Sequence, residues 1–551
     1  MKKNVFVFAV FITFHSNVFG QLCTSERYLS NIFQSSVLED VVFGNSPALT
    51  AVYVAENVTV NQEMTMDIFF PVGDNLPKRP LVVLAYGGGF LVGAKEDEDV
   101  WATCDSLAKK GYVTASINYR MNMNVTSGAS AVRAMYRAAQ DYSSAIRYLK
   151  EFSGTYGIDT NYVFVGGVSA GGFSAMHAVY MDDNERPAAT FQSGLLGIAP
   201  DLGCVNCAGN GHQHSTNVRG IINLWGAMLD TNYIQPNEIV PMTLFHGTND
   251  LIVPSDFGFP FTALFLIPEV FGSENITTHV NNLGGNAELN LFPGVGHNIW
   301  GVNVANQLVG GPTEYWNQIT DSIVSFLYEN IQPNQPQLQV SAPACEMDTV
   351  FIQISNFPDG GMGCWSVELG SVAWASSDSS EIGVVWNTTG TFTVEAVVFN
   401  HLDAVSISNQ LEVVVSPTPV VSISATNGIL EASGNYPQYQ WYLNGVPIQG
   451  ENQSQLIPTA SGSYTVEATN AEGCSTFSDP VLAVGIQEQL AANPSINSIK
   501  VFDVLGRFLG QFRKQEELAR QNWNGNQLLL LQYFDVDQNL IGTERKPTSA
   551  F

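Results

Sequence analysis

The chain has 551 residues, of which 45% are hydrophobic and 11% aromatic, so it carries enough apolar material for several packed domains. This composition excludes wholesale disorder and collagen-like or low-complexity sequence. Lys and Arg number 22 against 50 Asp and Glu, which gives a formal net charge of -28. A surface this acidic argues against binding to nucleic acid or to anionic membranes.

The N-terminus has the three parts of a secretory signal peptide. Two lysines follow the initial Met, Val5–Phe14 is an almost unbroken apolar run, and Val18 and Gly20 are small enough for a signal-peptidase site. We therefore expect residues 1–20 to be removed. The alternative is a membrane anchor, which needs about 20 apolar residues. Neither this run nor any later stretch reaches that length, so we expect no membrane span after signal removal.

Residues 21–331 alternate short apolar runs with helical patterns. The runs have the length and composition of buried strands, and they are Leu81–Tyr86, Val113–Tyr119, Tyr162–Gly166, Gly220–Trp225, Met242–His246 and Leu289–Phe292. Asp97–Lys110 and Ser130–Phe152 lie between them and have the pattern of helices. This alternation predicts βαβ units, and hence an α/β domain with a doubly wound, mostly parallel sheet over residues 21–331.

One predicted strand leads directly into a possible nucleophile. Tyr162–Gly166 is followed by Gly167-Val168-Ser169-Ala170-Gly171, which matches the pattern G-x-S-x-G, and a helix is predicted over Gly171–Met181. The strand–turn–helix of a nucleophile elbow needs small residues around the serine, because its backbone is tight and strained. The five-residue pattern alone occurs by chance in many proteins, but in this context it makes Ser169 a candidate nucleophile.

Three glycines follow another predicted strand, in Tyr86-Gly87-Gly88-Gly89-Phe90. Residues without a Cβ let backbone N–H groups approach a developing oxyanion. We predict that Gly88, Gly89 and Ala170 supply the N–H groups of an oxyanion hole. The alternative is a flexible glycine-rich turn, whereas a Rossmann phosphate loop is excluded because the G-x-G-x-x-G spacing is missing.

Two loops after predicted strands carry the remaining candidate catalytic residues. Asp250 follows Met242–His246, and His297 follows Leu289–Phe292. The carboxyl ends of strands are where open α/β sheets gather catalytic groups. The chain order Ser, Asp, His is the order of α/β-hydrolases. The other histidines considered are assigned structural roles, and they are His177, His246, His279 and His401.

Residues from about 60 to 330 resemble the α/β-hydrolase superfamily, in its carboxylesterase and hormone-sensitive-lipase-like branches. The matching segments are Tyr86–Phe90, Tyr119-Arg120, Gln140-Asp141, Ala145–Leu149, Gly167–Gly172, His246–Asp250 and Gly296-His297. Tyr86 stands before the glycines, as in type-B carboxylesterases, where the hormone-sensitive-lipase branch usually has His. The resemblance implies that Ser169 is the nucleophile, that His297 moves the proton and that Asp250 orients His297, with no metal or organic cofactor.

The seven cysteines of an exported chain are disulfide candidates, and the odd count leaves at least one unpaired within the chain. We predict a pair between Cys204 and Cys207 and a second between Cys345 and Cys364, because each pair is close in sequence. A third pair, Cys23 with Cys104, is the weakest prediction. The alternative for Cys204 and Cys207 is a zinc site completed by nearby histidines at positions 212 and 214.

A phenylalanine-rich stretch follows the candidate acid. It is dense in apolar residues over Phe257–Phe271, including Phe259 and Phe265. Such residues near a catalytic loop predict the lining of an acyl or aryl pocket. Ordinary core packing or a subunit interface is an equal alternative.

After Leu327 the helical sequence pattern gives way to a pattern of short strands and turns. A Pro/Gln linker at Gln332–Pro336 is followed by short strands and turns, which predicts two β-sandwiches at residues 332–417 and 418–485 and a last β domain at 486–551. The sandwiches resemble PKD-like and immunoglobulin-like modules of exported bacterial enzymes. Residues 486–551 partly resemble the C-terminal sorting domain of type IX secretion, on Ile499–Arg507 and Arg545-Lys546-Pro547. The resemblance implies a secretion-machinery partner and a secreted or surface location in a Gram-negative bacterium.

These observations predict a secreted serine carboxylic-ester hydrolase. Two alternatives stay open: a serine peptidase on the same fold, since both chemistries use the same triad, and a non-catalytic surface adhesion protein on a hydrolase scaffold. Adhesion proteins of that kind typically lose the nucleophile or base, whereas Ser169, Asp250 and His297 are all present. The sequence leaves open which ester is cleaved, whether acetyl, feruloyl, lipid or polyester.

Overall fold

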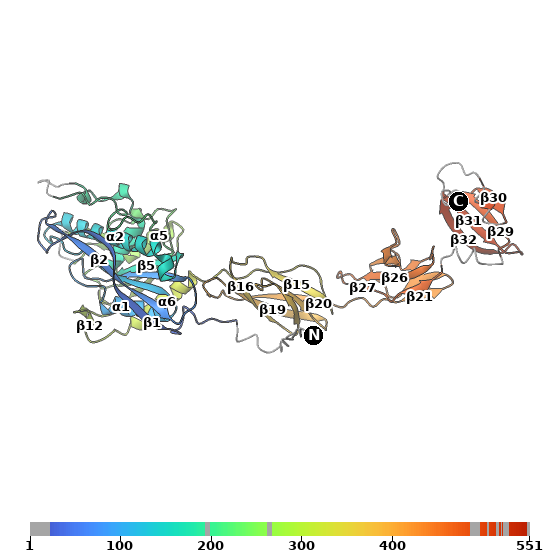
Figure 1. Ribbon diagram of the computed structural model, residues 1–551, viewed down its shortest axis with the longest axis horizontal. Helices are drawn as coiled ribbons and strands as arrows, with labels where there is room; N and C mark the ends of the chain where they lie inside the picture. The colour runs from blue at the N-terminus through green and yellow to red at the C-terminus, as the bar shows by residue number, and fades with distance from the viewer. Residues whose placement is uncertain are drawn as a thin grey trace, which may run out of the picture.

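The computed structural model describes residues 23–192, 199–261, 267–484, 496–503, 506–513, 517–518, 521 and 528–547. The predicted signal peptide, residues 1–20, lies outside them. Figure 1 shows the α/β domain and the two β-sandwiches in a row, with the α/β domain at one end. No helix in the described ranges combines the length and the apolar character required to cross a bilayer.

The α/β domain is built on one eight-stranded sheet with the strand order β1-β2-β4-β3-β5-β6-β7-β10. Its strands are β1 (Gln34–Leu49), β2 (Thr59–Val72), β3 (Arg79–Ala85), β4 (Val113–Ile117), β5 (Ile158–Val168), β6 (Gly220–Leu224), β7 (Met242–Gly247) and β10 (Ala287–Phe292). β1 pairs antiparallel with β2 and β2 antiparallel with β4, and every other pairing is parallel. The predicted α/β class and mostly parallel sheet are confirmed.

Helices cover both faces of this sheet. They are α1 (Glu98–Lys109), α2 (Gly128–Glu151), α3 (Ser153–Tyr156), α4 (Ala170–Tyr180), α5 (Ser273–Asn282) and α6 (Trp316–Glu329). Figure 1 shows α2 and α5 on one side of the sheet and α1 and α6 on the other. Burial on both faces explains why central strands contain continuous apolar runs, as in β3, where residues 80–85 are all apolar and buried.

Short strands and 3-10 turns lie in the loops that connect these main elements. They are β8 (Phe257–Gly258), β9 (Val270–Phe271), β11 (Asn303–Val304), β12 (Gln307–Leu308) and 3-10 turns at Asp183–Glu185, Ala188–Thr190 and Thr231–Tyr233. β8 pairs with β9, and β11 pairs with β12 in a hairpin that follows the candidate catalytic His297.

The first sandwich is two four-stranded sheets around buried tryptophans at positions 365 and 386. One sheet has the order β13 (Leu338–Val340), β15 (Thr349–Ile354), β18 (Glu381–Val385), β17 (Ser371–Ala375). The other has the order β14 (Ala344–Cys345), β20 (Asn409–Ser416), β19 (Gly390–Phe399), β16 (Met362–Val367). Alternating buried and exposed residues along β15 and β19 fit strands with one face in a core.

The second sandwich packs around Trp441, which is fully buried on β23. Its sheets are β21 (Ile423–Thr426), β22 (Ile429–Ala432), β25 (Gln455–Leu456) and β24 (Val446–Pro447), β23 (Gln438–Leu443), β26 (Gly462–Thr469), β27 (Ser475–Phe477), with β28 (Val481–Ala483) also on β26. The described part of the last domain is a sheet of β30 (Phe508–Phe512), β29 (Ser498–Asp503), β31 (Leu528–Phe534) and β32 (Leu540–Pro547).

A loop of the first sandwich enters the core of the α/β domain. Leu402 and Ala404 are fully buried within that core. The amide of Asn400 donates to the carbonyl of Ile331 at 2.7 Å, and the hydroxyl of Tyr328 donates to the carbonyl of Val405 at 3.0 Å. The first sandwich is therefore docked on the α/β domain by apolar burial as well as joined to it by the linker.

The disulfides correct two of the three predicted pairs. Cys204–Cys207 is present as predicted. Cys345 bonds to Cys474 and Cys364 bonds to Cys23, so the predicted pairs Cys345–Cys364 and Cys23–Cys104 are wrong. Proximity in the sequence did not predict these pairs, because a disulfide forms between cysteines that are close in space. Cys345 on β14 lies beside the second sandwich, and Cys364 on β16 lies beside the N-terminal segment. Cys104 is the free cysteine, buried on α1.

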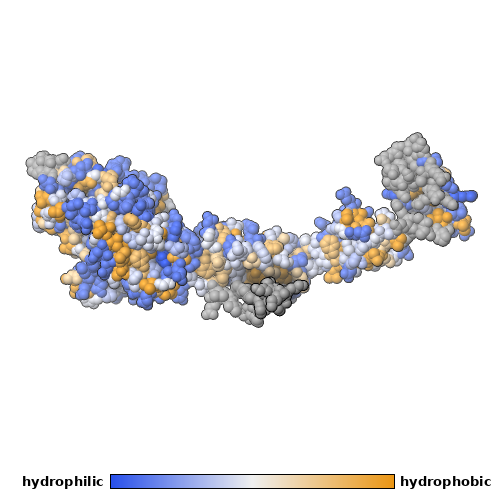
Figure 2. Space-filling view, viewed as in Figure 1, coloured by the Kyte–Doolittle hydropathy of each residue, from blue (hydrophilic) through white to orange (hydrophobic). Residues whose placement is uncertain are grey.

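Hydrophilic residues dominate much of the surface that Figure 2 presents, with apolar residues interspersed among them along all of the domains. This agrees with the acidic composition, in which Asp and Glu outnumber Lys and Arg by more than two to one. Apolar residues scattered over a surface are ordinary in globular proteins.

Candidate active site

Ser169 lies in a strained turn between β5 and α4. β5 ends at Val168, α4 begins at Ala170, and Ser169 between them has a φ of 52° and a ψ of -113°. Its N–H donates to the carbonyl of Leu224 on β6 at 2.7 Å, which holds the turn against the sheet. A Cβ at Gly171 would lie 2.1 Å from the carbonyl oxygen of Ala85, so only glycine lets the helix start this close to β3. This geometry is that of a nucleophile elbow.

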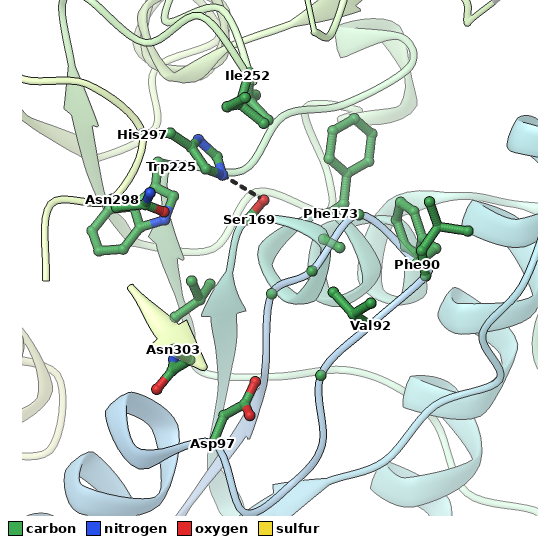
Figure 3. Close-up of a pocket in the computed structure, with 18 of the residues that line it drawn as sticks. Phe90, Val92, Asp97, Ser169, Phe173, Trp225, Ile252, His297, Asn298 and Asn303 are labelled. Carbon is green, nitrogen blue, oxygen red and sulfur yellow. Dashed lines mark hydrogen bonds between the residues drawn. The ribbon is translucent and has the colours of Figure 1, made fainter. Parts of the chain in front are cut away.

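The structure brings the three predicted catalytic side chains into one chain of hydrogen bonds. The hydroxyl of Ser169 lies 2.9 Å from Nε2 of His297, as Figure 3 shows. Nδ1 of His297 lies 2.6 Å from Oδ2 of Asp250. Asp250 lies on the loop after β7 and His297 on the loop after β10, and these two strands are neighbours in the sheet. Parallel pairing therefore brings residues 47 positions apart within contact.

The carboxyl of Asp250 is fully buried and held as an anion. Its Oδ1 accepts the N–H groups of Ile252 and Val253 at 2.8 and 2.9 Å. Burial opposes its ionisation, but hydrogen bonds from His246 and His297, together with the charge of His297, outweigh burial and hold the pKa of Asp250 well below its ordinary value. An ionised carboxylate at this position fixes Nδ1–H on His297 and leaves Nε2 free to accept the serine proton.

His246 is a functional neighbour that the sequence reasoning assigned only a structural role. Its Nε2 lies 3.0 Å from the carbonyl of Val253 and 3.3 Å from Oδ2 of Asp250. Its Nδ1 accepts the hydroxyl of Ser273, which in turn accepts the amide of Asn223. His246 and His297 thus contact the same oxygen of Asp250, and His246 helps to orient this carboxylate. The signal available in the sequence was the four-residue spacing of His246, at the end of β7, and Asp250, in the loop that follows.

The glycine loop lies against the elbow with its backbone in conformations that favour glycine. Gly88 has a φ of 107° and Gly89 a φ of 61°. A Cβ at Gly88 would lie 2.0 Å from the carbonyl oxygen of Val92. The hydroxyl of Tyr119 donates to the carbonyls of Tyr86 and Gly87, both at 3.1 Å, and supports the loop from behind. The structure therefore places the predicted oxyanion-hole residues Gly88, Gly89 and Ala170 around one cavity with Ser169.

This cavity has a volume of about 610 Å³. Most of its wall is apolar, as Figure 3 shows for Phe90, Val92, Phe173 and Ile252. Phe261, from the phenylalanine-rich stretch, also lines it. Phe257 instead packs against Phe271 with ring centroids 4.8 Å apart and is about half exposed. Phe259 is partly buried and is not among the residues that line the cavity. Phe265 falls within residues 262–266, outside the described ranges.

The other histidines have structural partners. His177 is buried between the carbonyl of Phe173 and the N–H of Leu229, and burial lowers the pKa of His177 to about 4. His279 contacts the carbonyl of Ile234 at 3.2 Å. Cys204 and Cys207 bond to each other, which removes the alternative of a zinc site there. In the ranges the structure describes, no cluster of three or more His, Cys, Asp or Glu is arranged to hold a metal ion.

Comparison with known proteins points to esterases. The family described as BD-FAE matches residues 66–228. A probable isoprenylcysteine alpha-carbonyl methylesterase of Arabidopsis thaliana, ICMEL1, is 22% identical over 255 residues, covering 42% of this chain and 48% of the relative. A second probable methylesterase of this name, ICME of Oryza sativa subsp. japonica, is 21% identical over 319 residues, covering 54% and 65%. The chain thus spans about half to two thirds of the length of these curated relatives.

Solved structures also include a similar esterase. Est2 of the planctomycete Thermogutta terrifontis, solved with propionate bound, is 20% identical with a TM-score of 0.34. The match covers 52% of this chain and 94% of that one. The strand order and the turn at Ser169 in this chain themselves show the α/β fold.

Proposed function

We propose that the protein is a serine carboxylic-ester hydrolase that works through an acyl-enzyme intermediate. The observation that carries the proposal is the chain of contacts from Ser169 to His297 to the buried, ionised Asp250, beside a glycine loop in which Gly88 and Gly89 have positive φ. The similarity to esterases over the α/β domain supports the same chemistry.

The reaction follows from these contacts in two halves. Oγ of Ser169 attacks the ester carbonyl while Nε2 of His297 takes the hydroxyl proton, and the oxyanion formed is stabilised by the N–H groups of Gly88, Gly89 and Ala170. The C–O bond to the alcohol breaks as His297 returns that proton to the leaving oxygen. Water then attacks the acyl-serine with His297 as base, and the carboxylic acid leaves while Ser169 regains its proton. Asp250 stabilises the imidazolium in both halves.

The proposal is tested with Ser169→Ala in the full chain. Loss of the attacking oxygen is expected to lower kcat on p-nitrophenyl esters by at least ~10³-fold, with an unchanged melting temperature. Ser322→Ala, on α6 and away from the pocket, is the matched control and retains full activity. Activity of Ser169→Ala within tenfold of wild type overturns the assignment. Efficient cleavage of peptide anilides instead of esters favours a peptidase.

We also propose that the chain is exported to the outside of a Gram-negative cell. Three disulfides support an oxidising compartment. In this proposal residues 1–20 are the signal peptide, the two sandwiches are PKD-like and immunoglobulin-like modules, and residues 486–551 are a type IX sorting domain. Mass spectrometry of protein recovered from culture medium or outer membrane tests this. A mature N-terminus at Gln21 is expected, and exclusively cytoplasmic, unprocessed protein contradicts it.

A further inference from the structure

One wall of the catalytic cavity is made of hydrogen-bond acceptors. Asp97 and Asn303 line the same cavity as Ser169. Asp97 precedes α1 and is only 7% exposed, although it is an acid in an otherwise largely apolar cavity. In Figure 3 its carboxylate extends toward the cavity, below Val92 and beside Asn303. Burying a carboxylate costs folding free energy unless a cation or a hydrogen-bond donor pairs with it. The groups around Asp97 therefore indicate its role.

The ordinary reason for an Asp before a helix does not account for Asp97. An N-cap Asp usually accepts the N–H of the second or third helical residue. Asp97 occupies the N-cap position of α1 but makes no side-chain cap bond, and its carboxylate accepts the backbone N–H of Ala94 instead. The next two acids do have structural partners. Glu98 accepts the N–H of Leu308 at 2.6 Å, and Asp99 accepts the N–H of Val100 at 2.8 Å.

Among the described residues, no Lys, Arg or His forms an ion pair with Asp97. The nearest lysine in sequence, Lys95, is bonded to Asp67 at 2.8 Å, to Asp40 at 3.0 Å and to Glu96. Among the described residues that line the cavity there is no Lys or Arg. Burial, followed by the charge of Glu96, raises the pKa of Asp97 above its ordinary value.

Asn303 adds a second acceptor at the same place. Its side chain hydrogen-bonds to Asp99, and since a carboxylate only accepts, the amide nitrogen must face Asp99. Oδ1 of Asn303 then faces away, and it is buried without a hydrogen-bond partner in the described structure. Oδ1 of Asn303 therefore has no donor, and the carboxylate of Asp97 has the N–H of Ala94 but no cation beside it.

We propose that Asp97 and Asn303 form a recognition subsite for a hydrogen-bond-donating group, hydroxyl or ammonium, carried by the ester substrate. This inference rests on the proposed esterase function and narrows its substrate class. The preferred ester has an apolar body, which packs on the apolar wall of the cavity, and a donor at its far end. An ester with a carboxylate at that end is rejected by repulsion from Asp97.

Two series of rigid esters test the subsite in the full-length protein. The first is benzyl acetates and the second is methyl phenylacetates, so that the donor is placed on the alcohol side or on the acyl side. Each ring carries a para methyl, hydroxymethyl, aminomethyl or carboxylate group, and hydrolysis is followed by proton release. In at least one series we expect a donor-bearing ester to exceed its methyl counterpart in kcat/KM by tenfold or more, with the carboxylate ester slowest.

Variants of Asp97 identify the source of the preference. Because each preference is a ratio of two esters measured on one protein, partial loss of folded enzyme cancels. An ammonium preference is lost in both Asp97→Asn and Asp97→Leu, because both remove the charge. A hydroxyl preference survives in Asp97→Asn, which keeps an acceptor, and is lost in Asp97→Leu. Asp256→Asn removes the same charge from an exposed position after Asp250 that does not line the cavity, and it is expected to leave the ratio unchanged.

Three results overturn the inference. One is equal or faster hydrolysis of the methyl ester in both series, and another is a donor preference that persists in Asp97→Leu. The third is failure of both series in an enzyme that cleaves short p-nitrophenyl esters. Each of these leaves the esterase function standing. Failure of every ester, p-nitrophenyl esters included, overturns the esterase function itself and the subsite with it.

Discussion

Two histidine–aspartate pairs lie in this molecule at almost the same distance, one in the active site and one at the junction with the first sandwich. His297 is 2.6 Å from Asp250, and His401 is 2.7 Å from Asp159. The side chain of His297 is 11% exposed, whereas that of His401 is 40% exposed and lies beside the ring of Tyr162. The first imidazole also contacts a serine hydroxyl on a strained turn, whereas among the described residues no serine hydroxyl contacts the second.

The comparison teaches that the His–Asp contact by itself carries no chemistry. Catalytic use requires a buried acid, an imidazole whose second nitrogen meets a nucleophile, and N–H groups for the oxyanion. The side chain of Asp159 is also buried, at 4% exposed, but among the described residues no nucleophile contacts the second nitrogen of His401, so we infer that the junction pair fastens two domains. Each experiment below changes one pair or its surroundings and asks whether activity or stability responds.

The largest difference is expected from removing the charge of each aspartate. Asp250→Asn loses the anion that holds the tautomer of His297 and stabilises its imidazolium, so kcat on p-nitrophenyl esters falls ~10³–10⁴-fold. Asp159→Asn, the matched change at the junction, leaves kcat within about twofold. Steady-state kinetics of both variants measure this. A mild Asp250→Asn places the acid role on another residue, and a severe Asp159→Asn removes the distinction between the pairs.

The junction should respond in stability. Leu402 is fully buried in the core of the α/β domain, and Leu402→Ala leaves a cavity there, so we expect the free energy of unfolding to fall by ~2–5 kcal/mol. Ile407→Ala, on the same segment but 64% exposed, is the control and changes it by less than ~0.5 kcal/mol. Urea unfolding followed by tryptophan fluorescence reports both. Equal effects of the two changes contradict docking of the loop into the core.

A buried acid without a histidine sharpens the contrast with Asp250. Burial raises the pKa of Asp99 to about 6 from its ordinary 3.8. The folded protein therefore binds this proton more tightly than the unfolded chain, and stability is lost as pH rises from about 4 through about 6. Asp99→Asn has no carboxyl to ionise, so it lacks this pH-dependent loss of stability. Its free energy of unfolding is expected to exceed that of wild type by up to ~3 kcal/mol above pH 7 and to equal it at pH 4. Melting temperatures across pH 4–8 test this, and a pH-independent difference contradicts it.

The smallest effect is expected from His401. Its side chain is 40% exposed, so water and salt screen its contact with Asp159. His401→Gln is expected to lower the free energy of unfolding by less than ~1 kcal/mol, less still at 1 M salt, and to leave kcat within about twofold. Unfolding at two salt concentrations and ester kinetics measure the two effects. A large loss of activity makes the junction part of the active site.

Local sequence signals predicted the site because its geometry is local to strand ends. Ser169 sits in a five-residue pattern between a strand and a helix, and parallel pairing of neighbouring strands then brings Asp250 and His297 to it. The glycines at 88 and 89 were visible because their backbone tolerates no side chain. The central strands were visible as apolar runs because helices bury both of their faces.

Features that depend on distant partners were missed. β1 and β2 are not among the predicted strands, because polar, exposed residues make up much of β1 and the first half of β2, and only the second half of β2 has the apolar, buried character of the central strands. Leu402 has no pattern that reveals a second domain around it, and the partners of Cys345 and Cys364 follow from how domains abut. In the sequence, His246 and Asp97 look like ordinary polar residues. A role for each can be inferred only from its neighbours in the folded protein.

The bond between Cys345 and Cys474 has a mechanical consequence. Tension applied between the α/β domain and the end of the second sandwich reaches Cys474 and crosses directly to Cys345, because the covalent bond is the shortest route. The 129-residue separation of the two cysteines thereby stays out of the load path, and that length of chain would extend about 430–460 Å if unravelled. Under tension the two sandwiches therefore behave as a short, nearly inextensible coupling. Only after this bond is reduced can the chain between Cys345 and Cys474 unfold and extend under load.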